Sequence, residues 1–119
     1  MKMRAMIMAL LLGAGVAQAA ETAYPTRLIR FICPYAPGGA ADIFTRTIGQ
    51  KLTDALGQSV VVDNRAGANG GIGTEIVARS PADGYTLLMG NAGPMTVNPN
   101  LYLKLGYDTV KDFAPITQG

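Results

Sequence analysis

Residues 31–45 constrain the fold of this chain most strongly. An apolar run ends at Pro34, Pro37 and two glycines follow, and Asp42 begins a run with helical spacing. This order of strand, glycine turn and helix is typical of open α/β sheets, in which ligands bind at the carboxyl ends of the strands. Free backbone N–H groups at a helix N-terminus favour anions. The stretch therefore predicts an α/β fold with an anion-binding corner.

The rest of the chain repeats this alternation of strand and helix. We predict strands over residues 27–33, 59–63 and 85–89, a second helix over residues 72–80, and a short helix or turn over residues 101–105. The strands are short, nearly continuous apolar runs, which is typical of strands that are covered on both faces. The β-α-β-α-β order with short links predicts a mostly parallel sheet with right-handed crossovers.

The two helices carry recognisable end and core signals. Asp42 is the predicted N-cap of the first helix, and Gly57 is the predicted glycine that ends it. One stripe at helical spacing predicts the buried face of this helix: Ala41, Phe44, Ile48, Leu52 and Ala55. In the second helix we predict that Ile72, Ile76 and Val77 point inward.

Three glycine-rich turns follow the three predicted strands, after Cys33, Asp63 and Met89. Because successive strands of a parallel sheet point the same way, these turns are predicted to lie at one edge. Glycines let a ligand approach the backbone, and the N–H groups that follow can bind a carboxylate. The alternative interpretation is that the glycines only make tight turns. The turns also carry small polar side chains: Asp42, Asn64, Asn69, Thr74, Asn91 and Thr96.

Composition excludes several kinds of site. The 119 residues contain no histidine and one cysteine, so they cannot form a Ser-His-Asp or Cys-His site, a Cys/His zinc site or an internal disulfide. Cys33 is predicted to be a small buried core residue. No turn matches a dinucleotide-binding or P-loop motif, and no carboxylate pair suggests a general acid and base. We therefore predict no catalytic residue, no metal ligand and no cofactor.

Two points about charge qualify these predictions. Without Lys2 and Arg4, eight basic and eight acidic residues remain, which gives no argument for a nucleic-acid partner or a membrane surface. Arg65 could pair with a ligand carboxylate. It could equally be solvated, or paired with Asp63 or Glu75.

The first residues have the pattern of a secretory signal. Lys2 and Arg4 precede an apolar run over residues 5–16, and an Ala-Gln-Ala sequence ends at Ala19. This pattern predicts cleavage after Ala19 and an exported mature chain that does not insert into the membrane. The apolar run is shorter than the roughly 20 residues that a membrane span needs. The alternative is a buried or anchoring helix.

Long motifs along residues 24–119 resemble one family. They include PYAPGG at residues 34–39 followed by Asp42, VVDNRAGA at 61–68, GIG at 71–73, ADGYTLL at 82–88, NPNLY at 98–102 and YDTVKDFAP at 107–115. Together they resemble the Bug family, the periplasmic solute receptors of tripartite tricarboxylate transporters. The resemblance implies a two-lobed periplasmic binding fold that closes on a small organic acid.

In that family the ligand carboxylate is held largely by backbone amides and waters of the loops after the first strands. Pro94 stands where the family usually has a residue with a free N–H, which proline lacks. Carried over to this sequence, the resemblance implies these ligand-binding residues: Pro37, Gly38, Gly39, Asp42, Asn69, Gly70, Gly71, Gly73, Asn91, Ala92 and Thr96.

The resemblance also implies a domain organisation and partners. Residues 1–19 are the expected signal peptide, and residues 20–119 the N-terminal part of the first lobe, an incomplete periplasmic-binding-protein-like lobe with a mostly parallel sheet. The expected ligand is a small organic acid, the expected partners are membrane transporter subunits, and the expected location is the periplasm. Because this part lacks the second lobe, we expect weak or no solute binding by the chain alone. The alternatives are an exported remnant that binds nothing, and an enzyme that uses the same sheet edge.

Overall fold

The computed structural model describes residues 23–118, so the predicted signal peptide lies outside the described residues. The predicted alternation of strands and helices is confirmed, and the boundaries of the three strands and of the second helix lie within two residues of the prediction. In order, the elements are β1 (Ile29–Cys33), α1 (Ala40–Leu56), β2 (Val60–Asn64), η1 (Ala68–Gly70), α2 (Gly71–Ala78), β3 (Thr86–Leu88), the π-helical turn η2 (Gly93–Val97) and α3 (Asn98–Leu101).

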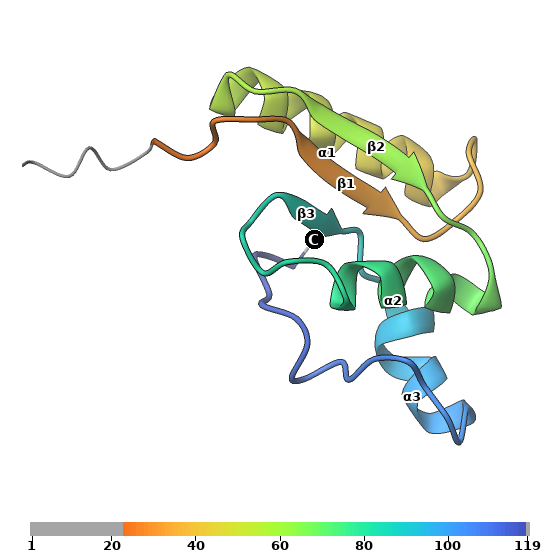
Figure 1. The fold of residues 1–119 in the computed structure, drawn as a ribbon. Helices are drawn as coiled ribbons and strands as arrows, with labels where there is room; N and C mark the ends of the chain where they lie inside the picture. The colour runs from red at the N-terminus through yellow and green to blue at the C-terminus, as the bar shows by residue number, and fades with distance from the viewer. Residues whose placement is uncertain (1–22, 119) are drawn as a thin grey trace, which may run out of the picture.

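The three strands form one parallel sheet, as the sequence predicted, and their order in it is β2-β1-β3. Phe31 in the central strand lies opposite Val62 on one side and Leu87 on the other. Helix α1 contacts β2 and β1, whereas α2 contacts β3 and β1. The two helices lie on opposite faces of the sheet (Figure 1). The centre of the core is β1, where Ile29, Ile32 and Cys33 have no exposed surface, which confirms the prediction for Cys33.

The rotation of α1 differs from the sequence prediction. Its N-cap is Gly39 rather than Asp42, and its buried positions are Asp42, Thr45 and Gly49. Phe44, which was predicted to be core, is 64% exposed, and Ile48 is 37% exposed. Both side chains precede buried positions by one residue, which turns them about 100° around the helix. The predicted core stripe is therefore wrong, although the predicted C-terminal glycine, Gly57, is confirmed with φ of 68°.

Small side chains explain this rotation. A Cβ added to Gly49 would lie 3.5 Å from Val62 and 3.6 Å from Val60, so α1 rests directly on β2 at this position. The hydroxyl of Thr45 donates to the carbonyl of Ala41 at 2.6 Å, which removes the cost of burying it. The helix therefore packs through its smallest residues and leaves its largest apolar side chains outside.

Helix α2 and the segment after β3 also differ from the prediction. Ile72 is 48% exposed rather than inward, and it covers Gly67, where an added Cβ would lie 2.5 Å from its Cδ1 atom. The predicted short helix or turn at 101–105 is instead a helical segment from Gly93 to Leu101. None of the helices within residues 23–118 has the length and apolar character needed to cross a membrane.

Candidate ligand-binding site

The turns that follow the three strands meet at one edge of the sheet, as predicted. We call residues 34–39 the first turn, 65–71 the second and 89–94 the third. Parallel pairing continues into them, since the N–H of Arg65 donates to Cys33 and the N–H of Met89 donates to Ile32. A hydrogen bond of 2.8 Å from the hydroxyl of Tyr35 to Oδ1 of Asn91 joins the first and third turns. The three turns therefore form one continuous surface.

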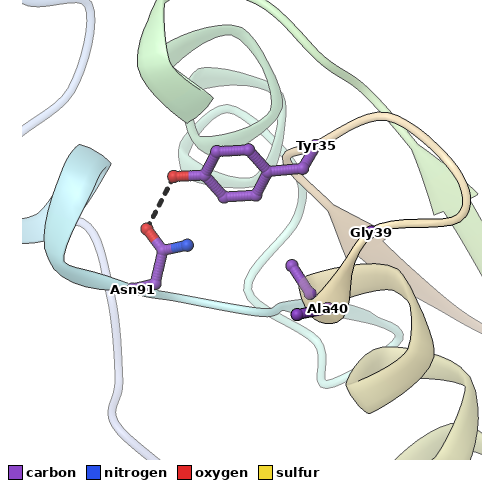
Figure 2. Close-up of a pocket in the computed structure, with 5 residues that line it drawn as sticks. Tyr35, Gly39, Ala40 and Asn91 are labelled. Carbon is purple, nitrogen blue, oxygen red and sulfur yellow. Dashed lines mark hydrogen bonds between the residues drawn. The ribbon is translucent and has the colours of Figure 1, made fainter.

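A pocket of about 230 Å³ lies between the first and third turns. Its lining residues are Tyr35, Gly39, Ala40, Ala41 and Asn91 (Figure 2). The backbone N–H groups of Gly39, Ala40 and Ala41 donate to no acceptor among residues 23–118. They stand at the N-terminus of a 17-residue helix, where the helix dipole adds partial positive charge.

Asn91 adds a further donor to this pocket. Its Oδ1 atom accepts from the hydroxyl of Tyr35 and from the N–H of Gly93, at 2.8 and 3.1 Å. These two bonds fix the amide so that Nδ2 is left without an acceptor in the described part of the chain. The residues that line the pocket thus carry several hydrogen-bond donors without an acceptor in the described part of the chain, an arrangement that suits a carboxylate.

Asp42 holds the first turn from inside. Its buried carboxylate accepts hydrogen bonds from Nε of Arg46 at 3.0 Å, the N–H of Gly38 at 2.9 Å and Nδ2 of Asn64 at 2.9 Å. These bonds, led by that from Arg46, lower the pKa of Asp42 to about 2. Nδ2 of Asn64 also donates to the carbonyl of Tyr35. The carboxylate of Asp42 is therefore ionised and occupied by neighbouring groups, rather than part of the pocket lining.

The second turn has an unusual backbone. Ala68 and Asn69 have φ of 48° and 49°, and Gly70 has φ of 81°. Asn98, which has no exposed surface, donates from Nδ2 to the carbonyls of Ala68 and Asn69 at 3.2 and 3.3 Å. Its Oδ1 atom accepts from Nδ2 of Asn69 at 3.1 Å. Sequence reasoning did not identify this role of Asn98, because nothing in a local pattern links it to a turn 29 residues away.

The third turn approaches the other two closely at two residues. A Cβ added to Gly93 would lie 2.8 Å from the hydroxyl oxygen of Tyr35 and 3.0 Å from Oδ1 of Asn69. Pro94 is fully buried and faces Gly70, and its carbonyl accepts from the hydroxyl of Tyr107 at 2.7 Å. Proline at this position thus contributes packing and a carbonyl acceptor, but no N–H donor.

The predicted ligand-binding residues fall into three groups in the structure. Gly39 and Asn91 line the pocket, whereas Tyr35, Ala40 and Ala41 line it without having been predicted. Other predicted residues are exposed on or beside the three turns: Pro37, Gly38, Asn69, Ala92 and Thr96. The remaining four are buried: Asp42, Gly70, Gly71 and Gly73.

Arg65 is paired with Asp63, which is one of the alternatives that the sequence left open. Its guanidinium donates to Asp63 at 2.9 and 3.2 Å, and Arg30 donates to the same carboxylate. Burial alone would raise the pKa of Asp63, but the hydrogen bonds from the two arginines lower it below its usual value. Within residues 23–118 there is no group of three or more side chains that could hold a metal ion.

Comparisons with known proteins agree with this fold and motif pattern. The family model described as the tripartite tricarboxylate transporter family receptor, TctC, matches residues 44–118. Protein BugT of Bordetella pertussis is 45% identical over 95 residues, which cover 79% of this chain and 29% of BugT.

Two solved structures are also similar to this chain. The periplasmic binding protein BugD superposes with a TM-score of 0.75 at 41% identity, over 78% of this chain and 31% of BugD. MatC from Rhodopseudomonas palustris, whose structure contains bound malate, superposes with a TM-score of 0.74 at 35% identity, over 77% of this chain and 31% of MatC. The chain thus spans less than a third of the length of these relatives. It belongs to the TctC family of tripartite tricarboxylate transporter receptors, which includes the Bug proteins.

Proposed function

We propose that this chain carries the carboxylate-binding corner of a periplasmic receptor that delivers a small organic acid to the membrane subunits of a tripartite tricarboxylate transporter. One observation carries the proposal. The N–H groups of Gly39, Ala40 and Ala41 and the Nδ2 group of Asn91 surround one pocket and have no acceptor in the described part of the chain.

The chemistry of this pocket favours one carboxylate group. Backbone donors at the start of α1 can form charge-assisted hydrogen bonds with both oxygens of a carboxylate, and the helix dipole attracts its negative charge. These donors recognise the carboxylate and not the rest of the molecule. We infer that groups outside residues 23–118 select among organic acids, and the malate in the structure of MatC is one example of the class.

The same proposal extends to organisation and location. We infer that residues 1–19 are a cleaved export signal and that residues 20–119 form the N-terminal part of the first lobe of a two-lobed receptor. The relatives support a periplasmic location, because they include periplasmic binding proteins such as BugD.

We expect the chain by itself to bind malate weakly. It covers 31% of MatC, so only part of a complete binding site is available to the ligand. A dissociation constant of about 1 mM or higher, which corresponds to roughly 4 kcal/mol, is what a single carboxylate site of this kind should give.

An NMR titration tests the proposal. Malate added to the ¹⁵N-labelled chain should shift the amide signals of Gly39, Ala40 and Ala41 and the side-chain amide of Asn91 in a saturable way. Malamide, which has the same shape without the charges, should leave them in place. Shifts scattered over the chain, or equal shifts with malamide, would contradict the proposal. A micromolar dissociation constant for malate would contradict the expected weak binding.

A single substitution removes one donor without disturbing the helix. Ala40 is the first residue of α1, and the preceding Gly39 has φ of −85° and ψ of 173°, which a following proline accepts. Ala40→Pro should therefore keep the fold and weaken malate binding by roughly fivefold, the effect of about 1 kcal/mol. Unchanged affinity in the folded variant would show that this N–H does not contact the ligand.

A further inference from the structure

We propose that Asn98 is a positioning residue that turns the backbone donors of the second turn toward the carboxylate site. This inference rests on the proposed function and extends it to a side chain that does not line the pocket. Asn98 begins α3, far from the first turn in sequence, and is completely buried.

Among residues 23–118, all the hydrogen bonds of the Asn98 side chain go to the second turn. Its Nδ2 group donates to the carbonyls of Ala68 and Asn69, and its Oδ1 atom accepts from the side chain of Asn69. A buried asparagine with every bond directed to one short segment fixes the position of that segment strongly.

The segment needs such support because its backbone is in a rarely adopted conformation. Ala68 and Asn69 both have φ close to 50°, the left-handed region that residues with a Cβ atom seldom occupy. Asparagine tolerates this region, but alanine has no side-chain group to compensate for it. The bonds from Asn98 to both carbonyls supply that compensation.

The geometry of the peptide bond connects these carbonyls to the donor groups. In a planar trans peptide the C=O of one residue and the N–H of the next point in opposite directions. Because Asn98 binds the carbonyls of Ala68 and Asn69, the N–H groups of Asn69 and Gly70 point away from it. The N–H of Asn69 donates to no acceptor among residues 23–118, whereas the N–H of Gly70 belongs to the short helix η1.

The second turn is in contact with the pocket residues. A Cβ added to Gly70 would lie 3.1 Å from the hydroxyl oxygen of Tyr35 and from Pro94. The side chain of Asn69 lies against Gly93 in the third turn. A change in the second turn would therefore reach both Tyr35 and the third turn, which carries Asn91.

The test compares Asn98→Asp with Asn100→Asp. Aspartate keeps the shape and the acceptor of Asn98 but loses both donors, whereas Asn100 is exposed and donates to the carbonyl of Thr96, four residues before it. We expect malate to shift the amides of Asn69 and Gly70 in the unmodified chain and in Asn100→Asp. In Asn98→Asp these two shifts should disappear, while those of Gly39 to Ala41 persist and the affinity falls at least fivefold.

A second pair of variants separates positioning from folding and from the added charge. Asn98→Ala should lose the same two shifts, and adding Ala68→Gly should restore them, because glycine adopts a positive φ without strain. If Asn98→Asp does not fold, the double variant of Asn98→Ala and Ala68→Gly tests the positioning role of Asn98 instead.

The outcomes distinguish the two proposals. An unmodified chain whose first-turn and Asn91 signals do not respond to malate contradicts the proposed function. If those signals respond and the folded Asn98 variants still show the shifts of Asn69 and Gly70, the inference about Asn98 is wrong. It is also wrong if the folded double variant of Asn98→Ala and Ala68→Gly does not regain the two shifts.

Discussion

The first and second turns have the same order of strand, glycines and helix and lie at the same edge of the sheet, yet they are held in different ways. Asp42 holds the first turn through a charged group only four residues from Gly38. Asn98 holds the second turn through a neutral amide 29 residues away from Asn69. The comparison shows that a glycine-rich turn does not specify how its donors are kept in place. Three predictions test the comparison, beginning with the largest effect.

Gly73, in α2, packs against the first residue of each turn, so its substitution should disturb both turns. An added Cβ would lie 2.9 Å from the Cα atom of Pro34 and 2.9 Å from the carbonyl oxygen of Arg65. Because both are backbone atoms, neither can rotate away, and Gly73→Ala should lower the free energy of unfolding by about 3 kcal/mol. Urea denaturation measures this loss.

Gly39→Ala is the matched control for this variant. Gly39 has φ of −85°, and the nearest atom to an added Cβ is 4.0 Å away, so the only cost is that alanine is a poorer N-cap than glycine, and the unfolding free energy should fall by no more than about 1 kcal/mol. Equal midpoints for the two variants would show that the turns are not in contact at Gly73.

Acid should affect the first turn and leave the second unchanged, because only the first is held by a group that titrates. The pKa of Asp42 is lowered from 3.8 to about 2, so its carboxylate stabilises the fold fully above about pH 4, and this contribution is lost as the pH falls toward 2. The amide signal of Gly38 should therefore shift with a midpoint near pH 2, whereas Asn98 contains no group that titrates and the signal of Asn69 should stay constant. NMR measurements over this range check both expectations.

Asp42→Asn is the control for the acid effect. It should abolish the titration of Gly38 while other carboxylates, such as Asp63, still titrate. A midpoint near 4 for Gly38 in the unmodified chain would mean that the three hydrogen bonds to Asp42 do not favour its ionised form.

The smallest effect is expected on the exposed side of α1, because this helix packs on the sheet through Gly49 and Thr45 and turns Phe44 toward solvent. Phe44 is 64% exposed, so Phe44→Ser should change the unfolding free energy by no more than about 0.5 kcal/mol. Phe31, with 5% exposure, provides the contrast, and Phe31→Ala should cost several kcal/mol in the same urea experiment, roughly 3 to 5. A similar loss of unfolding free energy for Phe44→Ser would mean that Phe44 is buried, as the predicted core stripe required.

Local patterns were sufficient to predict much of this molecule. The apolar runs and glycine turns predicted the three parallel strands, the helices α1 and α2, the C-terminal glycine Gly57 and the meeting of three turns at one edge. These features depend on neighbours in the sequence and on the common direction of parallel strands. The motifs also predicted the family that the comparisons show.

Only the tertiary structure decided which face of α1 is buried and which groups hold the turns. The packing of Gly49 on Val60 and Val62 outweighs the larger apolar residues of the helix, because it is the shape of the sheet that selects the contact. The carboxylate of Asp42, which the sequence suggested as an N-cap, is bound by Asn64 and Arg46 instead. Asn98 reaches the second turn across 29 residues. A hydrogen bond over that distance leaves no periodic signal in a sequence, because it depends on where the folded chain brings the two segments together.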